Sequence, residues 1–509
     1  MIRRFALTRR DRAALRRRGL TPADAARQRE RLIRPAAPLR LDRPCRVGDG
    51  IERWSPARRR ALERLARAGA RRGLFSVLVP ASGAASRLFQ NLETLRRRRD
   101  ATGRPVASLV REKAFSESRV FFKHLDRLAL AGRLDAACRR RGASRQRLLT
   151  AGRWDEVLDA LFESGTASLP KGLVPFHGRG PGARTAFEEH LRAAATIVGD
   201  DRGRCRMHFT VAPDQRRAFA REARALQRKW GKRLGVRWRI QWSVQSPTTD
   251  TLALEKDGGW AREESGDLYF RPGGHGALLG NLEKTRAPFV FIRNIDNVSD
   301  APTDPAAAAW RRALGGRLMD LWEEGRRWIR VLEAGGPMEG AAAFVASTLG
   351  GRPPSKNPRS WLGRILRRPW RVCGMIAQRG DPGGGPFWVR ASSRSEGGPS
   401  KQIVEESQVG ARQRRLWRRS THFNPVDMVV ALRDHRRRPY RLADFADDRS
   451  VLVMEKMFRG RPVRVWERPG LWNGGMHRWN TVFVEIPAAL FTPVKRVTDL
   501  LRPGHRRAH

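Results

Sequence analysis

Residues 74–87 read LFSVLVPASGAASR, and this stretch decides the fold of the chain. Phe75 to Val79 is a short apolar run that favours a buried strand. The small residues after Pro80 form a turn that leads into a helical pattern, and such a turn directs backbone N–H groups at an anion. Strand, loop and helix in this order predict an α/β domain with a phosphate site at the loop. An ordinary tight turn is the alternative for the loop taken alone.

The alternation of strand and helix continues along the chain. Met207 to Val211, Val236 to Val244 and Phe289 to Arg293 have strand-like patterns, and Asp214 to Trp230 and Asp304 to Ala334 have helical patterns. Strands that alternate with helices predict a doubly wound, mainly parallel sheet.

Three units are expected. Residues 1–72 are highly charged and predict a helical N-terminal extension. Residues 73–350 predict the α/β domain, with a helical insertion at about 92–165. A Gly/Pro/Ser-rich stretch then marks a boundary, and residues 351–509 predict a C-terminal α+β region.

The charge is extreme, with 103 Lys and Arg residues and a formal net charge of +52. A GC-rich genome, which replaces Lys with Arg, is one explanation, and attraction to polyanions is the other. We expect nucleic acid to bind only non-specifically. The four cysteines are far apart and have no zinc spacing, which favours a reducing, cytoplasmic location. No apolar run has the length of about 18 residues that a membrane span needs, so no membrane partner is expected.

Four further segments carry polar residues that suit phosphate chemistry. Lys171 lies between Pro170 and Gly172, just before an apolar run, where it is a fixed point charge that can reach phosphate oxygens. Residues 271–279 read RPGGHGALL, and glycine at this density indicates positive φ or a close approach to a ligand. A solvated lysine and a simple turn are the respective alternatives.

The third segment, residues 289–297, reads FVFIRNIDN and delivers polar residues at the end of an apolar strand. Open α/β sheets bind their ligands there. A carboxylate at this place suits Mg²⁺, which prefers oxygen ligands and substrate phosphates. A helix cap is the alternative.

The fourth segment is the C-terminal third, where three weaker signals are QIVEESQ from Gln402, FNPVD from Phe423 and FTPVK from Phe491. The sequence contains no GxSxG, Walker A or GxGxxG motif.

In this order, the segments resemble those of the UDP-sugar pyrophosphorylases, which have a GT-A-like nucleotidyltransferase fold. The matching stretches are PASGAASR, Pro170-Lys171, PGGHG, Asn294-Ile-Asp296-Asn297, IVEES, Phe423-Asn424 and Pro493-Val-Lys495. The chain departs from that family in one spacing, because Pro170 follows the loop by more than eighty residues, whereas the pyrophosphorylases place the two close together. Nearly the full length is also similar to a bacterial family called domain of unknown function 4301. The stretches that carry this second resemblance are VPASGAASR, KGLVPFH, RPGGHGALL, NIDNV, DPGGGPFWV and PGLWNGGM.

The resemblance implies an Mg²⁺-dependent enzyme that joins a nucleoside triphosphate (NTP) and a sugar 1-phosphate to give a nucleotide sugar and pyrophosphate. It implies catalytic charges at Arg87, Lys171 and Lys495, and a metal ligand at Asp296. It implies nucleotide-binding residues, namely Ser82, Gly83, Ala84, Ala85, Ser86, Gln245, Gly273, Gly274, His275 and Gly276. It implies sugar-binding residues, namely Asn294, Asn297, Glu405 and Asn424. The alternatives are a glycosyltransferase on the same fold and a non-catalytic nucleic-acid-binding protein.

Overall fold

The structure is a computed structural model that describes residues 6–301, 303–380, 383–391 and 397–505. The outermost residues of the two terminal units therefore lie outside the described residues, as does the start of the DPGGGP segment.

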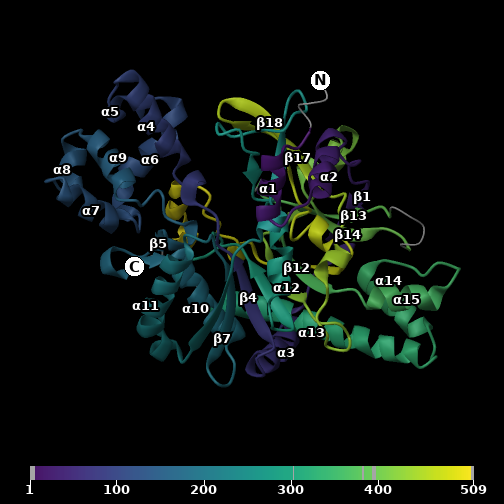
Figure 1. The fold of residues 1–509 in the computed structure, drawn as a ribbon. Helices are drawn as coiled ribbons and strands as arrows, with labels where there is room; N and C mark the ends of the chain where they lie inside the picture. The colour runs from purple at the N-terminus through teal and green to yellow at the C-terminus, as the bar shows by residue number, and fades with distance from the viewer. Residues whose placement is uncertain (1–5, 302, 381–382, 392–396, 506–509) are drawn as a thin grey trace.

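A ten-stranded mixed sheet forms the centre of the molecule (Figure 1). Its strands, in spatial order, are β2 (Arg46–Val47), β3 (Gly50–Glu52), β19 (Asn480–Glu485), β12 (Trp370–Ala377), β16 (Asp427–Ala431), β11 (Phe289–Arg293), β4 (Phe75–Pro80), β7 (Arg204–Thr210) and β8 (Arg237–Ser243). The short β15 (His422–Phe423) pairs with β12. Along the main path β16 runs antiparallel to both of its neighbours, and the other neighbouring pairs are parallel. The expected α/β class is confirmed, and the sheet is mixed.

Alternate residues of each central strand face opposite sides. On β4, Phe75, Val77 and Val79 pack into the core beneath the long helices, whereas Leu78 packs into the core on the other face. The long helices that contribute to the first core are α3 (Pro56–Arg71), α10 (Ala186–Val198), α11 (Arg216–Leu234) and α13 (Pro305–Glu333). The second face is covered by the short α12 (Leu279–Glu283) and by turns, including the 3-10 turn Leu442–Phe445. Helices α14 (Glu339–Leu349) and α15 (Pro358–Leu366) extend the first core beside β12.

The region between β4 and β5 (Pro175–His177) forms a helical lobe beside the sheet (Figure 1). Its helices are α4 (Gln90–Thr102), α5 (Val106–Leu109), α6 (Ser116–Lys123), α7 (Ala131–Arg140), α8 (Arg145–Thr150) and α9 (Trp154–Glu163). The lobe has its own apolar core, and Val494, Val497 and Leu500 from the C-terminal segment pack into that core. The core of the lobe is therefore built from the region between β4 and β5 together with the C-terminal segment, which is distant in sequence. Its base carries the short pair of β5 and β6 (Arg184–Thr185).

The N-terminal segment contains α1 (Arg9–Arg17) and α2 (Pro22–Ile33), but it is not helical throughout. These two helices pack on a second sheet, which contains β10 (Phe270–Arg271), β9 (Thr251–Glu255), β18 (Arg461–Glu467) and β17 (Leu452–Phe458). A third sheet contains β1 (Leu41–Pro44), β13 (Gly385–Val389) and β14 (Ser400–Val404), with the short α16 (Arg414–Trp417) beside it. β1 is an edge strand, which tolerates Pro44 because proline lacks an N–H donor.

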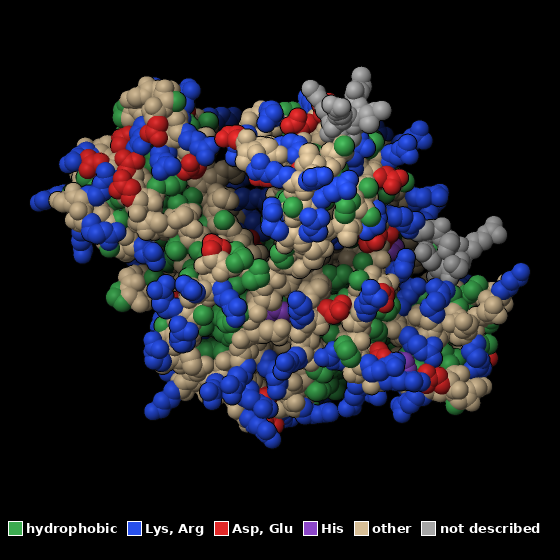
Figure 2. Space-filling model, viewed as in Figure 1, with side chains coloured by type: hydrophobic (Ala, Val, Ile, Leu, Met, Phe, Trp, Pro, Cys, Tyr) green, Lys and Arg blue, Asp and Glu red, His purple; other side chains and the backbone are tan. Residues whose placement is uncertain are grey.

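Lysine and arginine side chains are spread over the visible surface of both the lobe and the sheet body rather than gathered in one place (Figure 2). Many exposed arginines pair with acids, as Arg43 does with Asp49 at 2.7 Å and Arg58 with Asp320 at 2.7 Å. No helix among the described residues combines the length and the apolar character needed to cross a membrane.

Candidate functional site

The small-residue loop after β4 meets the chain where it returns from the helical lobe. The N–H of Lys171 donates to the carbonyl of Gly83 at 3.1 Å, and Ala84 forms an antiparallel bridge with Pro170. The lobe thus explains the long spacing between the loop and the Pro-Lys pair. An insertion of more than eighty residues folds on its own core and returns the lysine to the loop.

Asp296 follows β11 and binds two lysines from distant segments. The Nζ atoms of Lys171 and Lys495 each donate to Asp296 Oδ2, both at 2.8 Å. Asp296 is only 7% exposed and the side chain of Lys171 is 12% exposed, whereas that of Lys495 is 55% exposed. The pair of ammonium groups therefore lies at the boundary between the protein interior and solvent.

The attraction between Asp296 and the two lysines stabilises the charged forms of these side chains. Burial raises the pKa of the Asp296 carboxyl, but the two lysines outweigh burial and hold its pKa below the usual value. Burial lowers the pKa of Lys171, and attraction to Asp296 offsets only part of that effect. One carboxylate beside two ammonium groups leaves an excess of positive charge, which suits an anionic ligand.

The segment that carries Asp296 is fixed by backbone contacts. The carbonyl of Asp296 accepts from the N–H of Val494 at 3.0 Å, and Oδ1 of Asn297 accepts from the N–H of Thr492 at 2.9 Å. Arg293, which is buried on β11, donates to the carbonyl of Asn297 at 3.0 Å. Sequence reasoning missed the role of Arg293. An arginine inside an apolar strand was the signal that could have revealed it.

The glycine-rich segment 271–279 lies against a second glycine-rich loop. His275 stacks on Trp472 with ring centroids 4.0 Å apart, and its Nδ1 accepts from the N–H of Leu471 at 3.0 Å. A Cβ added to Gly276 would lie 2.1 Å from the carbonyl oxygen of Pro469, so this approach requires glycine. Gly274 has a φ of 74° and is likewise suited to glycine.

The same loop links His275 to Glu405. Asn473 donates to Glu405 Oε1 at 3.0 Å, and Nε2 of His275 lies 3.9 Å from that oxygen. Burial raises the pKa of the Glu405 carboxyl, and the charge of nearby Glu467 raises it further. Trp472 and Asn473 were not among the predicted site residues. Their position between Gly470 and the Gly474-Gly475 pair in PGLWNGGM was the available signal.

Other predicted residues have more local surroundings. Arg87 is exposed and forms no hydrogen bond or ion pair with the residues that the structure describes. Gln245 follows β8 and donates to Asp250 at 3.5 Å. Asn294 is half-buried, and its carbonyl contacts His190. Asn424 is buried, and its side chain donates to the Gly374 carbonyl and accepts from the Val426 N–H. These contacts engage both polar atoms of the Asn424 side chain.

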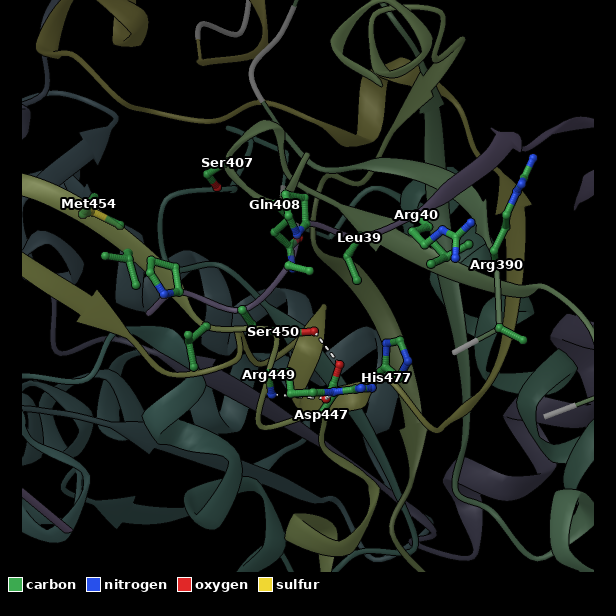
Figure 3. A pocket seen from close by; sticks show the side chains of 18 of the residues that line it. Leu39, Arg40, Arg390, Ser407, Gln408, Asp447, Arg449, Ser450, Met454 and His477 are labelled. Atoms are coloured by element: carbon green, nitrogen blue, oxygen red, sulfur yellow. Dashed lines mark hydrogen bonds and ion pairs between the residues drawn. The ribbon is translucent and has the colours of Figure 1, made fainter. Parts of the chain in front are cut away.

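A cavity lies beside the turn after Glu405, where Ser407 and Gln408 contribute to its lining, and none of the residues that line it belongs to the Asp296 cluster (Figure 3). This cavity is therefore separate from the Asp296 cluster. The Asp296 cluster is formed where Lys171 and Lys495, from distant segments, converge on one carboxylate.

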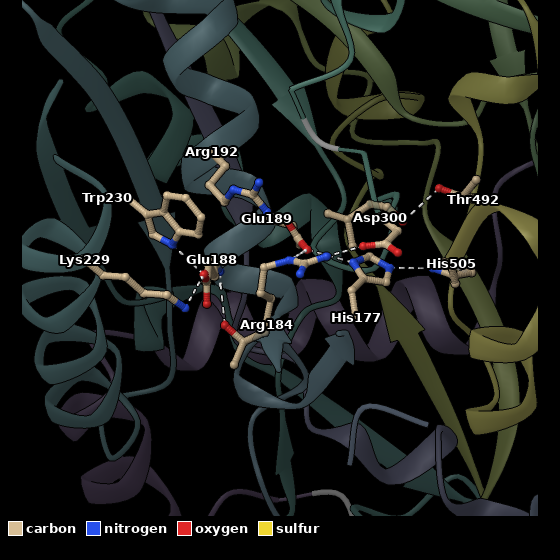
Figure 4. Close-up of polar contacts among 12 residues, drawn as sticks. His177, Arg184, Glu188, Glu189, Arg192, Lys229, Trp230, Asp300, Thr492 and His505 are labelled. Carbon is tan, nitrogen blue, oxygen red and sulfur yellow. Dashed lines mark hydrogen bonds and ion pairs between the residues drawn. The ribbon is translucent and has the colours of Figure 1, made fainter. Parts of the chain in front are cut away.

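A second charged cluster surrounds Glu189 near the base of the lobe (Figure 4). His177, Glu189 and Asp300 are close enough together to hold a metal ion. However, Arg184 pairs with both carboxylates, and Nδ1 of His177 lies 2.9 Å from Glu189. A guanidinium group between the two acids replaces the charge that a cation would bring, so this cluster is better suited to holding the fold together.

Together, the fold and the site define a mixed α/β protein in which a lysine-paired aspartate lies at a strand end beside a small-residue loop. The chain belongs to the family described as Domain of unknown function (DUF4301), whose model matches residues 8–506. No curated protein matches the sequence.

The solved structures that are similar to this chain include two from Trypanosoma brucei. One is the uridine diphosphate N-acetylglucosamine pyrophosphorylase from Trypanosoma brucei, with 13% identity and a TM-score of 0.46 over 94% of this chain and 74% of that chain. The other is the UDP-glucose phosphorylase from Trypanosoma brucei, with 13% identity and a TM-score of 0.36 over 65% of this chain and 61% of that chain.

Proposed function

We propose that this protein is a nucleotidyltransferase that joins an NTP and a sugar 1-phosphate, giving a nucleotide sugar and pyrophosphate. The observation that carries the proposal is the convergence of Lys171 and Lys495 on Asp296, each at 2.8 Å, beside the loop after β4. Three remote segments bring two ammonium groups to one strand end. The arrangement is suited to a ligand rich in phosphate.

The reaction needs no nucleophile from the protein. An oxygen of the sugar phosphate forms a bond to the α-phosphorus of the NTP, and the bond from that phosphorus to the β-phosphate oxygen breaks, so pyrophosphate leaves. The protein contributes position and charge neutralisation. Lys171 and Lys495 neutralise the charge that develops at the α-phosphate, while Arg87 and the amides of residues 82–84 hold the β- and γ-phosphates. The amide of Ala85 already donates to the carbonyl of Leu169 at 3.4 Å.

A magnesium ion fits this site only together with the nucleotide. Oδ2 of Asp296 already accepts from both lysines, so Oδ1 is the oxygen left for a metal. Mg²⁺ in such sites is commonly held by one or two carboxylates plus substrate phosphates. When bound, the ion would neutralise phosphate charge. Lys171 and Lys495 can then transfer their hydrogen bonds from Asp296 to the phosphates.

The two glycine-rich segments supply the other end of the proposed site. In the GT-A-like arrangement, Gly273 to Gly276 and Gln245 face the base. Asn294, Asn297 and Glu405 face the sugar, and Asn424, whose side chain is bonded to Gly374 and Val426, would hold the adjoining loop in place. The 3.9 Å approach of His275 to Glu405 supports a shared boundary between the base and sugar regions.

Nucleotide binding can be tested by thermal shift with a panel of NTPs, with and without Mg²⁺. A ligand that binds the folded state raises the melting temperature by mass action. We expect one NTP to stabilise the wild type in a Mg²⁺-dependent manner, and Asp296→Asn to abolish the Mg²⁺ dependence. Asp320→Asn, which changes a carboxylate on α13 that pairs with Arg317, is the matched control and should behave as the wild type. Unchanged Mg²⁺ dependence in Asp296→Asn would remove Asp296 from the proposed site.

A further inference from the structure

The cavity beside the turn after Glu405 has a volume of about 620 Å³, a size typical of small-molecule sites. It is built from segments that are distant in sequence: residues 35–40, the end of β13, the turn after Glu405, residues 447–451, the pair of β17 and β18, and His477 (Figure 3). Figure 3 shows Arg40 and Arg390 on one side of the cavity and Met454 on the other. The proposed reaction uses no residue of this lining.

The cavity has an excess of positive charge. The guanidinium groups of Arg40 and Arg464 form no hydrogen bond or ion pair within the part of the chain that the structure describes. Arg390 pairs loosely with Asp42 at 3.4 Å. The acids of the lining are Asp447, which accepts hydrogen bonds from Arg449 and Ser450, and Glu455, which faces Arg464 across the strand pair. An anionic group would complete the charge balance.

Part of the wall is apolar. Residues 35–39 contribute prolines, alanines and Leu39, and β17 with the turn before it contributes Val451, Val453 and Met454. A sugar or base ring can pack on such a surface while its phosphate contacts the arginines. The lining therefore favours a phosphorylated small molecule over inorganic phosphate alone.

Two short hydrogen-bond paths connect the cavity to Glu405. Gln408 lines the cavity, and its Oε1 accepts from the N–H of Glu405 at 3.0 Å. Asp447 also lines the cavity and donates its N–H to the Gly474 carbonyl at 2.9 Å, and Asn473, the neighbour of Gly474, donates to Glu405 at 3.0 Å. A ligand in the cavity would contact both paths.

We propose that this cavity is a second, non-catalytic binding site for a phosphomonoester of nucleotide or sugar-phosphate size, and that its occupancy is transmitted to the Glu405 turn. The binding does not depend on the proposed reaction. The effect of occupancy on the Glu405 turn rests on the proposed function, because that function places Glu405 beside the sugar.

Hydrogen–deuterium exchange on the full chain, with adenosine monophosphate, glucose 6-phosphate or inorganic phosphate as probes, would locate the binding. We expect at least one of the two organic phosphates to protect residues 35–40 and 451–455, together with 405–408, and inorganic phosphate to protect them less. The two organic probes distinguish a nucleotide from a sugar ligand. Protection confined to residues 82–87 and 171, or no protection by either organic probe, would overturn the proposal.

Charge-matched variants separate a built site from general attraction. Arg40→Gln with Arg464→Gln should weaken binding by tenfold or more, measured by calorimetry. Arg60→Gln with Arg64→Gln removes the same charge from exposed positions on α3 and should leave binding unchanged. Lys171→Ala should retain binding at the cavity. Equal weakening in both arginine pairs, or loss of binding in Lys171→Ala alone, would contradict a separate site.

Discussion

The Asp296 cluster and the Glu189 cluster both contain buried acids paired with basic side chains, but they differ in exposure. The side chains of Glu189 and His177 are 0% exposed, and Arg184 and Arg192 add ion pairs to Glu189 at 2.8 and 3.0 Å. In the Asp296 cluster, Lys495 is more than half exposed and a single carboxylate serves both lysines.

The difference indicates two roles. The Glu189 cluster satisfies its own charges and joins the C-terminal end to the lobe base, because His177 Nε2 lies 2.8 Å from Nδ1 of His505. The Asp296 cluster has surplus positive charge near solvent. Substitutions in the first should therefore affect stability, and substitutions in the second should affect function.

The largest effect on stability is expected for Glu189→Gln. Removing one partner of a buried ion pair leaves uncompensated charge and costs about 3–5 kcal/mol. Urea denaturation would measure this loss, with Asp320→Asn as a control on a partly exposed ion pair, where less than about 1 kcal/mol is expected. Normal stability with lost activity would assign the Glu189 cluster to function and remove the contrast.

Lys171→Ala should reduce turnover and leave stability almost unchanged, which is the opposite of the effect expected for Glu189→Gln. A contact that strengthens in the transition state is worth about 3 kcal/mol, so turnover should fall about a hundredfold. The urea midpoint should change little, because Asp296 keeps Lys495 as a partner. Single-turnover kinetics would isolate the chemical step. A variant that unfolds but turns over normally when stabilised would show that Lys171 is structural.

A smaller effect on the free energy of unfolding is expected when the pH is lowered, because His208 on β7 is buried. Burial lowers the pKa of this imidazole to about 4. Between pH 6.5 and 4 the unfolded chain binds a proton that the folded chain does not, so the free energy of unfolding falls as pH falls, by up to about 1.4 kcal/mol per pH unit. Denaturation of His208→Gln across this range should show a shallower slope than the wild type. An equal slope in the variant and the wild type would mean that groups other than His208 determine the pH dependence of stability.

The smallest effect on turnover is expected when Arg96, Arg97, Arg98 and Arg99 are all changed to Gln. These residues lie on α4 of the lobe, and three of them pair with acids of α4 or α9. Charges separated by more than about 8 Å are largely screened at physiological salt. Turnover should be retained, whereas weak DNA retention at low salt should decrease. If this variant alone lost the protein's measurable function, the nucleic-acid-binding alternative would be favoured.

The sequence predicted the local elements better than their arrangement. β11 was predicted at its observed bounds, because an uninterrupted apolar run between polar residues is a strong strand signal. The antiparallel direction of β16 was not predicted, since direction depends on long-range pairing that local patterns do not encode. The strands at residues 41–52 were missed because each has four residues or fewer and depends on pairing with distant partners.

The sequence singled out Lys171, Asp296 and Lys495, and the structure brings them together. Their segments were recognisable because each combines a lysine or acid with proline or a preceding strand. The support from Trp472 and Asn473 could not be derived in the same way, because the stacking of Trp472 on His275 and the hydrogen bond from Asn473 to Glu405 join distant segments and are set by tertiary packing. How the lobe returns Lys171 to the loop likewise required the structure.

The most direct measurement is pyrophosphate release from a panel of NTPs and sugar 1-phosphates with Mg²⁺, comparing the wild type with Asp296→Asn. The account predicts that the wild type releases pyrophosphate only when both substrates are present, and that Asp296→Asn loses this release while keeping the wild-type urea midpoint. Release of a nucleoside diphosphate from a nucleotide sugar instead, or full pyrophosphate release by Asp296→Asn, would contradict it.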